Sequence, residues 1–231
     1  MYMEEDVMAG QMTHMEIAYE LASRLHMDEG REEFIMGSVA PDAVHYTEPF
    51  RTEKIHTHLC ENVGAWGHAE NYDVWLGNIR EFWNKYVTTE TDAKKKAFLM
   101  GICVHCLTDY WNDLMVWKVC QKKMMPPMNF DEFKEAYYPE AQRLDRWLYQ
   151  VSGWSEKIMK LFNNAKVMGF KDYVNEAELY ELKDYLINTQ YNLQGTVDVS
   201  DHKYYKSDHL LNFIAEATDK IHEQLQELMI A

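Results

Sequence analysis

The segment from Thr91 to Val119 constrains the fold more than any other part of the sequence. Its apolar residues recur at the three- and four-residue spacing of an α-helix, and they fall on several sides rather than along one stripe. Thr91 and Asp92 precede the segment as helix-capping residues. A helix that is apolar on many sides has to be covered by other elements. We therefore predict that this helix lies at the centre of the fold.

The remainder of the chain shows the same helical periodicity. Further helices are predicted over about 13–26, 32–39, 72–86, 140–163 and 175–188, with a last helix after a Ser207 cap. Thr13 with Glu16, and Asn175 with Glu178, have the spacing of a capping box. Loops are predicted over 41–57 and 190–206, and Asp131 is predicted to cap a helix. Since no repeat or linker divides the chain, we expect an all-α fold with residues 1–231 forming a single compact domain.

The charge of the chain narrows the partners it can bind. Its formal net charge is −15, and such an acidic surface repels phosphate backbones and anionic lipid. We therefore expect no binding of duplex nucleic acid and no stable membrane association. A small phosphorylated substrate stays compatible, because bound cations reverse the local charge. Four cysteines without a disulfide framework, and a start without a signal-peptide pattern, lead us to expect a cytoplasmic protein.

Two residues inside the predicted central helix can carry chemistry. His105 and Asp109 stand four residues apart, so their side chains project from the same face, one turn from each other. An imidazole and a carboxylate at this spacing can bind one ion, or the carboxylate can bridge two. The alternative is a His–Asp hydrogen bond within the helix. Either way, an unpaired carboxylate buried in an apolar helix is costly.

Other candidate ligands stand near the ends of predicted elements. His14 opens the first helix, Asp42 follows Pro41 at a break after the second helix, and His56 and His58 follow the same loop. Imidazole nitrogen together with carboxylate oxygen suits zinc, and less specifically manganese or iron. We expect His14, Asp42 and the central His–Asp pair to converge on divalent ions. His58 is the expected fifth ligand, with His56 as an alternative or a hydrogen-bond donor to it.

These residues also occur in a recognisable order. Thr13-His14 is followed by Gly37…Pro41-Asp42-Ala43, then by Thr57-His58, and then by Phe98…Gly101-x3-His105-x3-Asp109. This order, which covers about the first 115 residues, resembles the zinc-dependent phospholipase C family, which is related to the single-strand-specific zinc nucleases. The resemblance implies a helical bundle of that type with a cluster of zinc ions in a cleft.

The resemblance also implies roles for individual residues. Asp42, His58, His105 and Asp109 would hold one ion, and Asp109 would bridge to a second ion bound by His14. Asp42 would orient or deprotonate the attacking water, and is the predicted catalytic residue. Two or three divalent ions are expected as cofactors.

The chain departs from the family pattern in two places. The family's secreted members use a mature N-terminal tryptophan as a ligand, whereas this chain starts MYMEEDVMAG. Those members also carry a further His and a His-x3-Glu after the His-x3-Asp motif, whereas no histidine occurs here between Asp109 and Asp201. These departures put a third ion, and lipid cleavage itself, in doubt.

Several residues have weaker assignments. His202 is a candidate to compensate for the missing ligands, and His45 is a candidate to line the cleft near Asp42. Cys103 and Cys106 flank His105, where buried helical thiols are the favoured interpretation over a zinc-binding pair. The resulting hypothesis is a metal-dependent hydrolase of a phosphodiester or small phosphorylated substrate. The alternative is a non-catalytic helical protein with a structural or sensory metal site.

Overall fold

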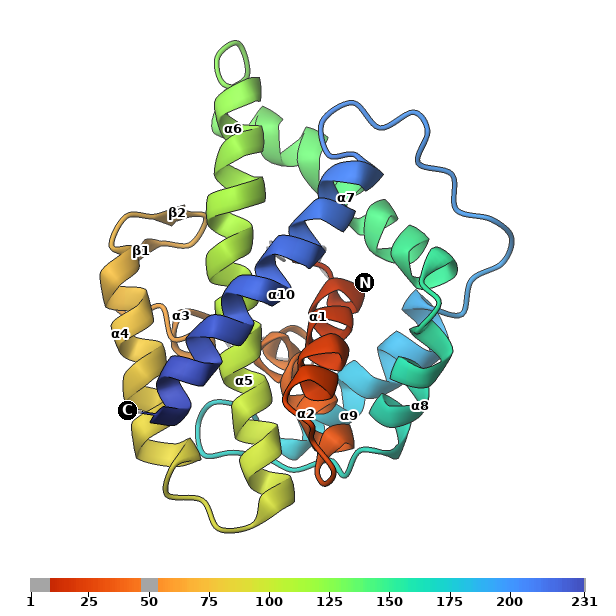
Figure 1. The fold of residues 1–231 in the computed structure, drawn as a ribbon. Coiled ribbons are helices and arrows are strands. Elements are labelled where there is room, and N and C mark those ends of the chain that lie inside the picture. The colour runs from red at the N-terminus through yellow and green to blue at the C-terminus, as the bar shows by residue number, and fades with distance from the viewer. Residues whose placement is uncertain (1–8, 47–53, 231) are drawn as a thin grey trace.

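The computed structural model describes residues 9–46 and 54–230 and shows an all-α fold (Figure 1). In chain order, the elements are α1 (Gln11–Arg24), α2 (Arg31–Gly37), the 3-10 helix η1 (Ala40–His45), α3 (Lys54–Thr57), β1 (Gly64–Ala65), β2 (His68–Ala69), α4 (Tyr72–Phe82), the π-helical turn η2 (Trp83–Val87), α5 (Ala93–Asn112), the π-helical turn η3 (Asp113–Trp117), α6 (Lys118–Met124), α7 (Phe130–Val151), α8 (Ser155–Asn164), α9 (Glu176–Tyr185), the π-helical turn η4 (Leu186–Gln190) and α10 (Ser207–Ile230). The strands β1 and β2 form one short antiparallel hairpin.

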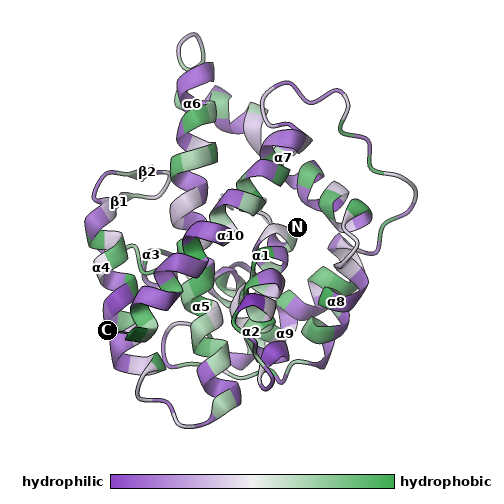
Figure 2. Ribbon diagram, viewed as in Figure 1, coloured by the Kyte–Doolittle hydropathy of each residue, from purple (hydrophilic) through white to green (hydrophobic). Residues whose placement is uncertain are grey.

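Helix α5 lies at the centre of the bundle, as its sequence predicts. Every residue from Ala97 to Tyr110 is buried. Helices α1, α2, α4 and α10 pack around it, and Figure 1 shows α10 crossing α5 near α1. Figure 2 shows hydrophobic and hydrophilic residues mixed along the outer helices α7 and α8, which is the pattern of helices with one buried face. Within the described residues, no helix is both long and apolar enough to serve as a membrane span.

Local capping signals identify two of the helix starts correctly. The Asp92 side chain accepts a hydrogen bond from the Lys95 amide, and Asn175 and Glu178 form a complete capping box. The predicted Asp131 cap is wrong, because Asn129 forms a capping box with Glu132 and α7 begins earlier.

The region around Pro41 is more ordered than its sequence predicts. Pro41 lies in the first turn of the 3-10 helix η1, where its missing amide hydrogen costs nothing. Residues 40–45 and 54–57 are therefore helical rather than loop, while residues 47–53 of that predicted loop lie outside the described residues. The predicted helix 140–163 is also two helices, α7 and α8, because the chain turns at Ser152. The single-domain prediction for residues 1–231 stays a prediction.

Candidate metal centre

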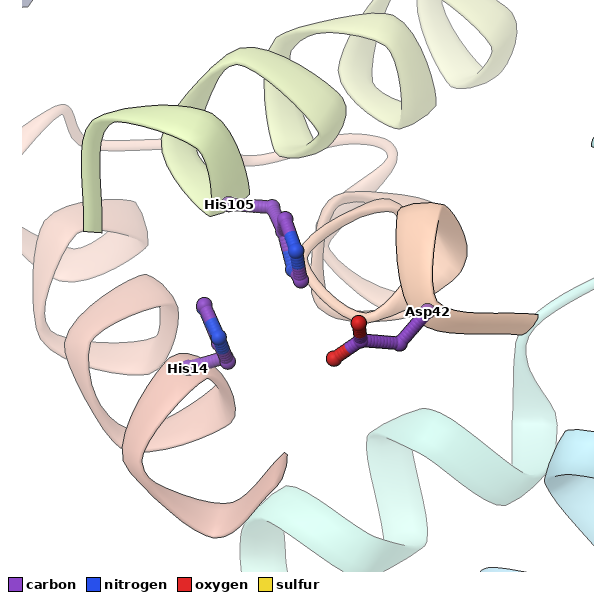
Figure 3. Close-up of side chains that lie close together, drawn as sticks. All are labelled: His14, Asp42 and His105. Atoms are coloured by element: carbon purple, nitrogen blue, oxygen red, sulfur yellow. The ribbon is translucent and has the colours of Figure 1, made fainter. Parts of the chain in front are cut away.

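Five polar side chains from four segments converge in the interior. His14 comes from α1, Asp42 from η1, His58 from the residue after α3, and both His105 and Asp109 from α5. Each residue is at most 2% exposed. Figure 3 shows His14, Asp42 and His105 pointing into a common space between their helices. The predicted convergence of these segments is therefore present in the fold.

The five residues form two overlapping groups of possible ligands. One group is His14, Asp42 and His105, and the other is His58, His105 and Asp109; within each group the ligand atoms lie within 4.8 Å of one another. The rings of His14 and His105 stack, with centroids 4.0 Å apart and planes inclined by 10°. The two groups share His105, so together they form one continuous cluster of possible ligands.

A glycine contact between two helices fixes the position of His105. Helix α2 passes so close to α5 that a Cβ atom on Gly37 would lie 2.1 Å from the carbonyl oxygen of Phe98. A Cβ atom on Gly101 would lie 2.4 Å from the carbonyl oxygen of Phe34. Only glycine permits this approach. It brings the backbone after α2 against α5, where Nδ1 of His105 donates a hydrogen bond to the carbonyl oxygen of Ser38 over 2.8 Å.

Backbone carbonyls determine which ring nitrogens are available. Nδ1 of His105 lies against the Ser38 oxygen, and Nδ1 of His58 lies 2.9 Å from the carbonyl oxygen of Lys54. A carbonyl oxygen can only accept, so both Nδ1 atoms carry hydrogen. In the neutral rings, Nε2 then presents a lone pair to the cluster. This arrangement is the one that backbone acceptors impose on metal-binding histidines.

Those nitrogen lone pairs face carboxylate oxygens. Nε2 of His58 lies 3.0 Å from Oδ1 of Asp42, and Nε2 of His105 lies 3.3 Å from Oδ2 of Asp109. Nε2 of His14 lies 3.4 Å from Oδ1 of Asp109. A lone pair that faces a carboxylate oxygen is stabilised only when a proton or a cation stands between the two atoms. This geometry is therefore favourable only with positive charge inside the cluster.

Hydrogen bonding leaves several of these atoms unsatisfied. Both nitrogens of His14, Nε2 of His105 and Oδ1 of Asp109 are buried and have no hydrogen-bond partner among the described residues. A buried polar atom without a partner costs about 1–3 kcal/mol. Four such atoms in one small space have a common explanation if they are ligands.

The electrostatics of the cluster keep most of its ligands in the state that binds cations. Burial, reinforced by the charge of His105, lowers the pKa of His14. Burial also lowers the pKa of His58, against the opposing effect of Asp42. Burial alone would raise the pKa of Asp109, but His105 and His14 outweigh it and hold that pKa below its ordinary value. Neutral imidazoles beside an ionised carboxylate are the metal-binding forms of these groups.

His105 and Asp42 are linked more strongly. Burial would lower the pKa of His105, but the carboxylates of Asp109 and Asp42 outweigh it and raise the pKa above its ordinary value. Burial would raise the pKa of Asp42, yet His105 and His58 hold it well below its usual range. Below this raised pKa, and without a metal ion, His105 supplies positive charge to the cluster as a bound proton. A divalent ion would take over that role.

The donor set fits the metal that the resemblance implies. Three imidazole nitrogens and two carboxylates match the ligand preference of zinc, and fit manganese or iron less specifically. Oδ1 of Asp109 faces His14, while its Oδ2 faces His105 at 3.3 Å and His58 at 3.7 Å. The two oxygens of one carboxylate thus address two sides of the cluster, which suits a bridge between ions.

The weaker candidates lie outside these groups. Nδ1 of His56 lies 2.6 Å from Glu61 and its Nε2 lies 3.2 Å from Asp172, so the structure brings His58 rather than His56 to the cluster. His202 is not available as a compensating ligand, because its Nδ1 contacts the carbonyl oxygen of Tyr205 and its Nε2 accepts from Arg143.

His45 and the cysteines also belong to neither group of ligands. His45 lies at the end of η1, half-buried, three residues after Asp42. Cys103 and Cys106 are buried and free, and burial raises the pKa of both thiols. The favoured interpretation of these two cysteines as buried helical thiols therefore agrees with the structure.

Gln11 is a site residue that the sequence analysis missed. Its side-chain amide donates a hydrogen bond to Oδ2 of Asp42 over 2.7 Å, and Gln11 is 2% exposed. Gln11 precedes His14 by three residues, which places both on one face of α1. That spacing was the available signal, but it becomes informative only when η1 is known to lie against this face.

Comparison with known proteins agrees with this geometry. A family model described as zinc dependent phospholipase C matches residues 13–111, a segment that contains all five converging residues. No curated protein and no solved structure matches the chain. The match confirms the resemblance seen in the sequence. Residues 13–111 are therefore similar in sequence to the zinc-dependent phospholipase C family.

Proposed function

We propose that this protein is a metal-dependent hydrolase that cleaves a phosphoester in a small phosphorylated substrate, through a site for two or three zinc-like ions. The observation that supports the proposal most directly is the buried cluster, in which imidazole lone pairs face carboxylate oxygens. Only a proton or a cation between these atoms makes such contacts favourable. The family match supports the phosphoester substrate class.

The bound ions would supply hydroxide at neutral pH and neutralise charge on the phosphoester oxygens. The side chains of the chain supply the rest. Gln11 holds one oxygen of Asp42, and the other oxygen lies 3.0 Å from His58. This clamp keeps Asp42 ionised and fixed in orientation, so Asp42 can accept the proton of an attacking water. Asp42 is the catalytic residue in this proposal.

The charge of the chain supports a small substrate rather than a polymer or a bilayer. With a net charge of −15, the surface repels nucleic-acid backbones and anionic lipid, whereas a buried site charged by ions attracts a single phosphate group. Exclusion of duplex nucleic acid, the lack of stable membrane association and a cytoplasmic location are part of the same proposal.

One observation favours a second candidate function. The five converging residues are each at most 2% exposed. Structural zinc sites are typically closed to solvent, whereas catalytic sites keep an open position. A structural or sensory metal site would bind ions without turnover. Binding of inorganic phosphate by the zinc-loaded protein separates the two candidates, since a closed site has no open position for it.

The test of the proposed function begins with purified protein supplemented with zinc, manganese or iron. Elemental analysis measures bound metal, and hydrolysis of bis-p-nitrophenyl phosphate and p-nitrophenyl phosphorylcholine measures activity. We expect Asp42→Asn to lower kcat at least about 100-fold. Asp28→Asn changes an exposed aspartate in the turn before α2 and serves as the matched control with unchanged activity. Turnover that is equal in the Asp42→Asn variant would come from a contaminant and would refute the proposal.

A further inference from the structure

The first turn of α1 has an unusual source of capping. Its N-cap residue is Gly10, which has no side chain to accept the free amide hydrogens of the turn. Instead, Oδ1 of Asp145 accepts the Met12 amide hydrogen over 2.8 Å, from a position 133 residues further along the chain. A Cβ atom on Gly10 would lie 2.2 Å from that same oxygen. Gly10 therefore leaves the space that the Asp145 carboxylate fills.

The opposite side of Asp145 is held just as firmly. Its Oδ2 accepts hydrogen bonds from the Gln190 amide and the Tyr191 hydroxyl, each over 2.7 Å. Asp145 is 3% exposed. Burial raises its pKa, whereas the hydrogen bonds from Tyr191, Met12, Gln190 and Thr13 act in the opposite direction. Its hydrogen-bond partners lie on α1 and at the end of η4, so the Asp145 carboxylate connects these two segments to α7.

The turn that Asp145 caps is also the turn that serves the metal centre. Gln11 at its start donates a hydrogen bond to Asp42, and Nε2 of His14 at its end lies 3.4 Å from Oδ1 of Asp109 without a hydrogen-bond partner. A rotation or slip of this turn would move both residues together. We propose that Asp145 is a positioning residue of the metal centre, which sets the place of His14 and of Asp42 by fixing the first turn of α1. This inference rests on the metal-binding part of the proposed function.

Glu140 offers a matched control on the same helix. It is a buried carboxylate of α7, and it accepts the amide hydrogens of Lys203, Tyr204 and Tyr205 over 2.8–2.9 Å. Like Asp145, Glu140 accepts backbone amide hydrogens from a segment that is distant in the sequence. Residues 203–205, which it binds, contain none of the five converging residues of the cluster. A variant of Glu140 therefore reports what the loss of a buried backbone anchor does on its own.

The experiment is a zinc titration of the full chain in competition with a chromogenic chelator. His14→Ala identifies the binding step that depends on α1. We expect Asp145→Asn to weaken that step about tenfold, as is typical when a partner that orients a ligand is lost. Glu140→Gln should leave every step unchanged. Equal affinity in the wild type and Asp145→Asn, or equal weakening in both α7 variants, would overturn the positioning role.

A milder variant covers the case in which Asp145→Asn does not fold. Tyr191→Phe removes one donor to Asp145 and keeps the aromatic ring, and we expect it to weaken the same step about threefold, since the orienting contact is loosened rather than lost. In the His14→Ala background it should have no further effect; weakening there would overturn the inference. Absence of zinc binding in the wild type would refute the proposed function itself. Zinc affinity that is the same in the wild type, Asp145→Asn and Tyr191→Phe would refute only the positioning role.

Discussion

Two groups of buried carboxylates in this protein have opposite surroundings. Glu140 and Asp145 on α7 accept hydrogen bonds from backbone amides, a hydroxyl group and a side-chain amide. Asp109 on α5 faces imidazole nitrogens, and its Oδ1 has no hydrogen-bond partner among the described residues. The first kind of carboxylate holds segments together without help. The second kind is costly to bury until a cation binds beside it. The hydrogen-bond partners of a buried carboxylate therefore distinguish a structural residue from a candidate metal ligand.

The largest expected effect tests the carboxylate at the centre. Free zinc at about 1,000 times its Kd should raise the free energy of unfolding of the wild type by about 4 kcal/mol. Asp109→Asn should abolish most of this gain, because Asp109 contacts all three candidate histidines. Urea unfolding with zinc and with a chelator measures the gain. Equal stabilisation of the variant and the wild type would place the ion elsewhere.

The next effect tests whether packing or the ion positions His105. Gly101→Ala should lower the free energy of unfolding by about 3 kcal/mol, because the new methyl group would lie 2.4 Å from the Phe34 carbonyl oxygen. The loss should appear with zinc and without it. Gly77→Ala is the control, since no atom lies within 4 Å of that added methyl group. It should be neutral or stabilise α4 by up to about 1 kcal/mol. A tolerated Gly101→Ala would contradict the close helix contact.

A smaller effect is expected for the structural carboxylates on α7. Glu140→Gln should lower the free energy of unfolding by about 2 kcal/mol, because it weakens three hydrogen bonds to a buried charge. The stabilisation by zinc should stay at its wild-type size. A variant that loses its zinc response together with its stability would show that the two kinds of carboxylate are not independent.

The smallest effect concerns pH. The raised pKa of His105 means that this ring gives up a proton when zinc binds, so the zinc affinity should fall by up to about tenfold per pH unit below that pKa. In the metal-free protein, the stability of the fold changes with pH in the opposite direction to the zinc affinity. The proton on His105 stabilises the fold fully below about pH 6.5, and this contribution is lost as the pH rises through the raised pKa. Chelator competition and urea unfolding between pH 6 and 8 measure the two trends, and parallel trends would contradict the assignment.

Local signals in the sequence predicted much of this picture. The periodicity around His105 predicted a central helix, and the i, i+4 spacing predicted that His105 and Asp109 share a face. Capping patterns at Asp92 and Asn175 were confirmed because both partners of each cap are close in sequence. The fold class and the resemblance to the family followed from features of the same kind.

What the sequence could not predict depends on contacts between distant residues. Thr13 was predicted as the cap of the first helix, yet α1 starts at Gln11 because Asp145 supplies the acceptor from α7. In the same way, nothing local distinguishes His58 from His56; the Lys54 carbonyl turns one ring toward Asp42, while Glu61 and Asp172 hold the other away. Such choices are made by the packed chain.

The central claim is that the five converging side chains gather divalent ions. Diffraction from zinc-supplemented crystals, recorded on both sides of the zinc absorption edge, tests it most directly. We predict at least two anomalous peaks inside the cluster, one beside His14 and one among Asp42, His58 and His105, with Asp109 reaching both. A map from such crystals without an anomalous peak between these residues would contradict the account.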